Sequence, residues 1–222
     1  MIITKIPFSV IIEWMCLVAS ILFIPKNLVQ KHWRFFTIYL LTVVGVETFS
    51  YLIGRVIQVD VNKHILYNGF LLIWPIFHIW IFAKVISLKN INILCLLIGI
   101  AIATCYIVEA THFGLSFYLY RTDTLASGAV VLLSIIYYIS LFKQDEYHDL
   151  LKDAAFWFVT GCLIFYGTTT AINAFFEELV RIRIKGQVSL RYIIINIFNL
   201  IMYSCWIKSF LCLKNKQIYT RA

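Results

Sequence analysis

Residues 91–110 read INILCLLIGIAIATCYIVEA, and this stretch decides the class of the protein. Its one charged side chain, Glu109, stands near the end of the stretch. An α-helix of about 20 mainly apolar residues is long enough to cross the hydrocarbon core of a bilayer. The stretch therefore predicts a membrane-spanning helix.

The same pattern recurs along the rest of the chain. Seven apolar stretches of suitable length lie at 6–24, 35–57, 65–88, 91–110, 124–142, 154–176 and 192–213. Short, charged connections separate them, and none of these is long enough to form a soluble domain. We therefore expect an all-α polytopic membrane protein in which residues 1–222 form a single domain of seven transmembrane helices.

The composition supports this class. The chain has 222 residues, of which 62% are hydrophobic and 14% charged, and its mean hydropathy is +0.87. These values exclude a water-soluble domain and are the opposite of what disordered chains show. The net charge of +8 comes from basic residues scattered between apolar runs. We therefore expect contact with a lipid bilayer and none with nucleic acid.

The sequence lacks the usual signatures of metal and catalytic sites. Six cysteines are spread without a Cys-x-x-Cys pair, so we expect neither disulfides nor a metal, and no cofactor. Glu109 and His112 have the i, i+3 spacing of di-iron helices, but a second copy is absent. No metalloprotease, nucleophile-elbow or phosphate-loop motif occurs.

The distribution of Lys and Arg predicts the orientation. With seven helices, 11 of these residues fall on the side that holds the C-terminus and 8 on the side that holds the N-terminus. The positive-inside rule then places the N-terminus outside and the C-terminus in the cytoplasm. The connection before the last helix opposes this trend, since it alone carries Arg181, Arg183, Lys185 and Arg191.

That same connection alternates apolar and polar residues. In residues 180–185, Arg181, Arg183 and Lys185 share one face, and the pattern resumes at 188–191 after Gly186-Gln187. Alternation on both sides of a two-residue turn is typical of a β-hairpin. We expect a small basic hairpin on the outer face. A basic amphipathic segment lying at the lipid headgroups is the alternative.

Carboxylates occur inside two of the predicted helices. Glu13 lies within the first helix and Glu47 within the second, where Tyr51 and Arg55 follow on the same face. An ionisable group inside a membrane is expensive and is by default a functional candidate. Glu47, Tyr51 and Arg55 therefore predict a ligand or ion site. An internal salt-bridged strut is the alternative interpretation.

Other polar side chains mark the third, sixth and seventh predicted helices. These residues are Asn68, His78, Asn173, Asn196 and Asn199. Pro75, between Asn68 and His78, predicts a kink, because proline cannot donate the helical hydrogen bond. The residues predict a ligand-binding cavity between the second, third, sixth and seventh helices. Ordinary interhelical hydrogen bonding is the alternative.

Several short motifs resemble a known group of proteins. They are Glu47 with Tyr51, Leu66-Tyr67-Asn68, Phe156-Trp157 with Gly161 and Asn173, and Ile195-Asn196 through Asn199. Together they resemble small, uncharacterised bacterial seven-helix inner-membrane proteins, which are similar to sensory or accessory modules found beside signalling kinases. The resemblance implies a bacterial inner-membrane location and a signalling role. The chain departs from the group at 67–70, where it has no carboxylate.

These observations lead to one main expectation about function. We expect a non-enzymatic, receptor-like or accessory membrane module that binds a small or lipid-like ligand and signals through a membrane or cytoplasmic partner. A second copy of the chain, in a homo-oligomer, is another expected partner. A small transporter or channel subunit is the first alternative, and an intramembrane lipid-modifying enzyme without an evident nucleophile is the second.

Overall fold

The computed structural model describes residues 7–24, 32–53, 62–143, 149–175, 179, 181–184 and 188–219. The α-helices are α1 (Phe8–Phe23), α2 (His32–Tyr51), α3 (Lys63–Phe70), α4 (Trp74–Val85), α5 (Ile91–Phe113), α6 (Tyr120–Phe142), α7 (Ala154–Ala174) and α9 (Leu190–Tyr219). A 3₁₀ turn, η2 (Leu150–Lys152), precedes α7, and two short strands, β1 (Arg183–Ile184) and β2 (Val188–Ser189), precede α9.

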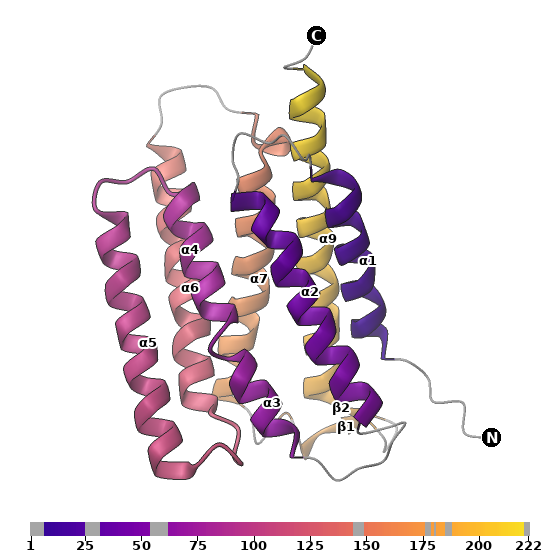
Figure 1. The fold of residues 1–222 in the computed structure, drawn as a ribbon, viewed down its shortest axis with the longest axis vertical. Coiled ribbons are helices and arrows are strands. Elements are labelled where there is room, and N and C mark those ends of the chain that lie inside the picture. Colours follow the sequence, from indigo (N-terminus) through magenta and orange to yellow (C-terminus); the bar gives the residue numbers. More distant parts are fainter. Residues whose placement is uncertain are drawn as a thin grey trace, which may run out of the picture.

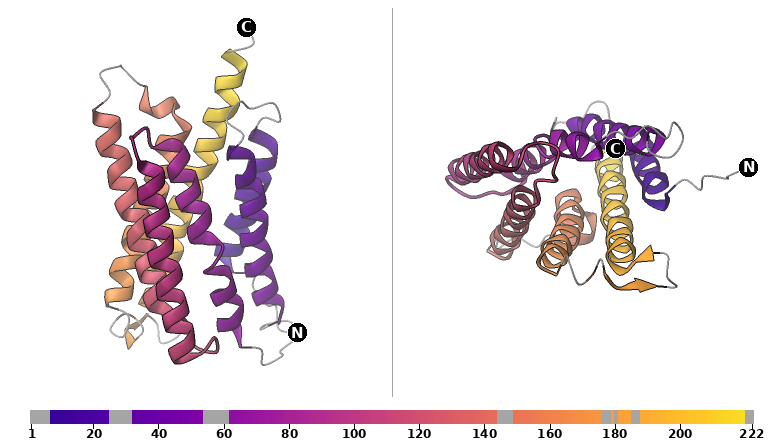
Figure 2. Two further views of the ribbon diagram at one scale, coloured as in Figure 1. Left: turned by 60° about the vertical axis from the view of Figure 1, so that its left-hand side comes forward. Right: turned by 90° about the horizontal axis from the view of Figure 1, so that it is seen from below.

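The helices run up and down along one long axis (Figure 1). α7 packs between α6 and α9, which places α4, α5 and α6 on one side and α1 and α2 on the other. Seen along the axis, the bundle is elongated (Figure 2). The start of α1, the strands and the turn between α5 and α6 lie at one end, which we call the hairpin end (Figure 1). α9 finishes at the opposite end, which we call the lysine end.

Five helical stretches of the described chain are long and apolar enough to cross a bilayer. They are Lys63–Val85, which combines α3 and α4, Ile91–Phe113, Tyr120–Phe142, Ala154–Ala174 and Leu190–Asn215. The predicted helical class is therefore confirmed. Five helical stretches could span a membrane, whereas seven such spans were predicted. α1 is apolar but only 16 residues long, and α2 is too polar to count among the five.

The outer surface of α5 shows how the bundle meets lipid. Leu97 and Ile100 are 58% and 54% exposed, and the helix buries few side chains. Exposed leucine and isoleucine along a whole helix are unfavourable in water and favourable against acyl chains. The described part of the chain thus has the surface of a bilayer-embedded protein.

Pro75 interrupts the third predicted span, as expected. α3 ends at Phe70 and α4 begins at Trp74, with Pro75 in the first turn of α4. The N–H groups of Leu72 and Ile73 bond to carbonyls three residues back instead of four, which tightens the chain between the two helices. The break is visible between α3 and α4 in Figure 1.

Some boundaries differ from the predicted ones for local reasons. α6 begins at Tyr120 rather than 124 because the Glu109 carboxylate accepts from the N–H groups of Arg121 and Thr122 and caps the helix. α9 continues to Tyr219 rather than 213. The predicted end lies where the hydropathy falls, which marks the edge of the membrane, but the polar residues that follow contain no glycine or proline to end the helix. Residues 54–57, predicted at the end of the second helix, lie outside the described residues.

The predicted antiparallel pairing before α9 is present but short. Arg183 pairs with Ser189 and Ile184 with Val188, so two residues of each strand take part. Arg191, predicted on the hairpin, instead lies in the first turn of α9, where the Ser189 hydroxyl accepts the N–H of Tyr192 and starts the helix. Lys185, Gly186 and Gln187 lie outside the described residues.

Candidate functional site

Glu13 of α1 and Glu47 of α2 lie at neighbouring levels on two helices that pack together. The indole N–H of Trp14 donates to Thr48 Oγ1 over 3.2 Å, which fixes α1 and α2 at the same level one residue beyond Glu13 and Glu47. Glu13 and Glu47 are close enough for their charges to interact. Glu13 is 3% exposed, and its Oε2 is buried without a hydrogen-bond partner among the described residues.

Glu47 is linked to α3 by a short polar chain. The Tyr67 hydroxyl contacts Glu47 Oε2 at 3.2 Å and Ser50 Oγ at 3.2 Å. A single hydroxyl hydrogen serves one of these acceptors at a time, and Ser50 can donate back. Tyr67 and Ser50 were not predicted as partners of Glu47, because periodicity along one helix does not indicate which neighbouring helix faces it.

The face predicted from Glu47, Tyr51 and Arg55 divides in the structure. Glu47 meets Tyr67 of α3, whereas Tyr51 lines a groove against α1. Arg55 lies outside the described residues. The alternative of a Glu47–Arg55 strut therefore stays a prediction.

A groove lies beside Tyr51. It has a volume of about 780 Å³, lies between α1 and α2, and is open along its length. Its walls are apolar or aromatic except at Thr48, and they include Val10, Trp14, Met15, Val18, Tyr51, Leu52 and Ile207. An open apolar channel with a polar group at its edge suits an acyl chain.

His78 lies at the centre of the bundle, away from the groove. Its Nδ1 is 2.8 Å from the Trp74 carbonyl and its Nε2 is 3.3 Å from the Tyr166 hydroxyl. A carbonyl can only accept, so Nδ1 carries the hydrogen and Nε2 accepts from Tyr166. Rings from four helices surround it, among them those of Tyr39 and Trp206. His78 thus occupies a dry, satisfied position.

Asn68 holds the turn between α5 and α6. Its amide group donates to the carbonyls of Leu115 and Phe117 over 2.9 and 2.7 Å. Its Oδ1 accepts the N–H of Leu119 over 3.2 Å. The side chain is fully buried. All three of these hydrogen bonds hold the backbone of the turn in place.

The remaining predicted asparagines lie nearer the hairpin end. Asn173 of α7 donates to Asp123 Oδ2 over 3.4 Å and to Thr124 Oγ1 over 3.2 Å, which ties α7 to α6. Asn196 donates to the Tyr192 carbonyl over 2.7 Å within α9, and Asn199 is half-buried on the same helix. The structure does not bring these residues to the groove.

The predicted basic residues take different positions. Arg181 is exposed just before β1. Arg191 is half-buried and close enough to Asp123 for their charges to attract. Tyr118 lies beside the same pair, and burial together with the Asp123 carboxylate raises the pKa of Tyr118 well above its usual range. The side chains of Arg183 and Lys185 lie outside the described residues.

Glu109 serves as a helix cap and not as half of a metal pair with His112. Besides the two N–H groups at the start of α6, its carboxylate accepts from the Thr122 hydroxyl over 2.7 Å. In the described ranges no group of three or more His, Cys, Asp and Glu side chains could hold a metal ion. All six cysteines are free thiols.

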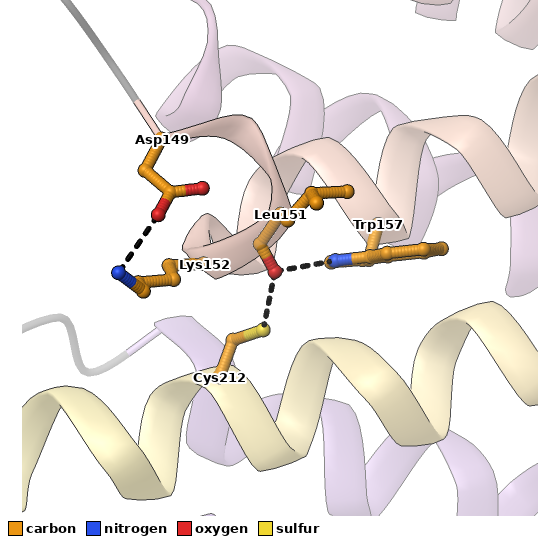
Figure 3. Close-up of polar contacts among 5 residues, drawn as sticks. All are labelled: Asp149, Leu151, Lys152, Trp157 and Cys212. Carbon is orange, nitrogen blue, oxygen red and sulfur yellow. Dashed lines mark hydrogen bonds and ion pairs between the residues drawn. The ribbon is translucent and has the colours of Figure 1, made fainter.

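At the lysine end, the connection into α7 is fastened to α9 (Figure 3). The Leu151 carbonyl accepts from Trp157 Nε1 over 3.0 Å and from Cys212 Sγ over 3.5 Å. Lys152 pairs with Asp149 over 2.8 Å, and this ammonium holds the pKa of Asp149 below its usual range. Both charged groups face solvent, so the pair adds little stability.

Comparison with protein-family models, curated proteins and solved structures finds no match.

Proposed function

We propose that the chain is a receptor-like or accessory membrane module that takes an acyl chain of a lipid-like ligand into the groove between α1 and α2. The observation that carries this proposal is the open apolar groove of about 780 Å³ between α1 and α2, in a bundle that has five helical stretches long and apolar enough to cross a bilayer. Trp14 and Tyr51 give the groove rigid walls, and Thr48 gives it a polar edge. Such walls favour binding of an acyl chain that carries a polar head group over binding of a plain hydrocarbon.

The proposed location is a bacterial inner membrane with the N-terminus outside and the C-terminus in the cytoplasm. Lys84, Lys89, Lys143, Lys208 and Lys214 are exposed at or near the lysine end. Their number there agrees with a cytoplasmic position. The basic hairpin end would then face outward, where anionic headgroups can offset its charge.

A photoactivatable phospholipid tests the ligand. The purified protein in native-lipid nanodiscs is irradiated, and crosslinked peptides are mapped by mass spectrometry. We expect adducts to concentrate on α1 and α2. Val18→Trp fills the groove and should reduce these adducts several-fold, whereas Ile100→Trp on the lipid-facing side of α5 should not. Equal labelling of the groove and of α5 would mean ordinary annular lipid and would contradict the proposal.

The signalling role is tested separately in cells. A photocrosslinking amino acid at Lys89, on the lysine end, should yield a defined protein adduct, whereas one at Ile100 should not. An adduct of twice the chain's own mass would identify a second copy as the partner. Solute or ion flux that depends on Glu47 in proteoliposomes would instead favour the transporter alternative.

A further inference from the structure

We propose that Glu13 and Glu47 form a proton-binding site that holds one proton between α1 and α2. The site is separate from the groove, because Glu13 turns into the bundle whereas Trp14, the next residue, lines the groove. Only the link between this proton and ligand binding in the groove rests on the proposed function.

Geometry places the two carboxylates at the same level of neighbouring helices. The Trp14–Thr48 hydrogen bond of 3.2 Å joins the residues that directly follow them. The unpartnered Oε2 of Glu13 is enclosed at this level. A buried carboxylate that is ionised and lacks a donor costs free energy, and protonation removes the charge and with it most of that cost.

Among the described residues, the surrounding charges do not balance two carboxylates. Lys63, at the exposed start of α3, acts on Glu47. The groups from the other packed elements that lie close enough to influence Glu13 or feel its charge are Cys16 on its own helix, Tyr39 of α2, Tyr67 of α3 and Tyr203 of α9. All four are neutral. One cation therefore faces two acids, and the deeper one, Glu13, has no compensating charge in the described part of the chain.

Two carboxylates in a low-dielectric site repel each other strongly when both are ionised, so such pairs keep one proton. A metal cation would need a shell of several oxygen ligands. The described residues provide no group of three or more metal-binding side chains, and the other polar neighbours are single hydroxyls. A proton needs only one oxygen, and it is the ligand that this pair fits.

Loss of the proton would act on the groove. A second negative charge beside Glu47 would draw water in and push α1 away from α2, because hydration is the remaining way to stabilise it. The Trp14–Thr48 bond would lengthen, and the groove wall formed by these residues would move. Ligand binding in the groove should therefore weaken as the pair loses its proton at high pH.

Infrared difference spectroscopy in nanodiscs tests the site without any ligand. A protonated carboxyl group has a C=O band distinct from those of carboxylates. We expect this band in the wild type at neutral pH and its loss in Glu13→Gln, since Glu47 beside Lys63 can then ionise. In Glu47→Gln the band should remain but disappear at lower pH than in the wild type, because the repulsion is gone. Asp149→Asn, which removes an exposed carboxylate, should leave the band unchanged.

Two results would overturn the proposal. One is a wild-type spectrum without a carboxylic-acid band at neutral pH. The other is loss of the band on adding sodium, but not choline, at constant pH, which would identify a cation site. If Glu13→Gln does not accumulate, ¹³C-labelled glutamate in the wild-type protein shifts the band and identifies a glutamic acid directly. Because no lipid enters this test, its failure and that of the groove proposal are distinguishable.

Discussion

At the scale of single residues, Gly161 determines how closely α7 and α9 approach. A Cβ placed on Gly161 would lie 3.0 Å from Cys205 Cβ and 3.1 Å from the Met202 carbonyl oxygen. The nearer obstacles are a Cβ and a backbone atom, which cannot move aside as the end of a flexible side chain could. Small residues at such crossings allow helices in membranes to pack closely.

We therefore expect Gly161→Ala to lower the free energy of unfolding by about 1–3 kcal/mol through overpacking. Gly45 of α2 provides the matched control, because nothing lies within 4 Å of its added Cβ. Gly45→Ala should be neutral or slightly stabilising. Thermal unfolding in detergent measures both variants. An unchanged melting temperature in Gly161→Ala would show that α7 and α9 can separate at little cost.

At the scale of elements, the α5–α6 turn depends on one side chain from α3. Replacing Asn68 by leucine keeps the branched shape of the side chain but leaves the carbonyls of Leu115 and Phe117 and the N–H of Leu119 without their partner. Each unpaired buried group costs about 1–3 kcal/mol unless water reaches it. Asn68→Leu should therefore loosen residues 115–119.

Amide hydrogen exchange of residues 115–119 measures this effect, and we expect it to rise at least tenfold in Asn68→Leu. Asn196→Leu is the control, because its amide bonds only within α9. Fast exchange of the turn in both variants would point to general destabilisation and would contradict a specific role for Asn68.

The same scale shows what the sequence could predict. Apolar stretches located the long helices, because lipid imposes a length and a hydropathy on each span. Pro75 located the break between α3 and α4. The start of α6 was missed, since its cap, Glu109, belongs to α5 and lies 12 residues before Arg121, whose N–H it accepts. The partner of Glu47 was missed for the same reason, because Tyr67 reaches it from α3.

At the scale of the whole molecule, alternation of the helices places the strands and the end of α9 at opposite ends (Figure 1). We expect the C-terminus in the cytoplasm, by the excess of basic residues on that side. A green fluorescent protein fused after Ala222 should therefore fluoresce, and a phosphatase fused there should be inactive. The reverse pair of results would invert the orientation, and it would place the basic hairpin inside.

The sequence predicts the members of the candidate site but not how they pair. Glu13 and Glu47 stand out as charges within apolar runs. Their pairing depends on how α1 packs against both α2 and α9, which no pattern within one helix specifies. Likewise His78, Asn68 and Asn173 look alike in sequence, yet the first sits among aromatic rings and the others tie connections and helices together.

The shortness of α1 has a consequence for the membrane itself. Sixteen residues between Pro7 and Ile24 extend over roughly 24 Å, against about 30 Å for a typical hydrocarbon core. With α1 crossing the bilayer as predicted, lipid beside it would have to thin to match this hydrophobic mismatch, or short-chain lipids would have to gather there. Thinning brings water and headgroups nearer to the depth of Glu13. Bilayer thickness would thus change how much water reaches the depth of Glu13, and the same chain would behave differently in membranes of different lipid length.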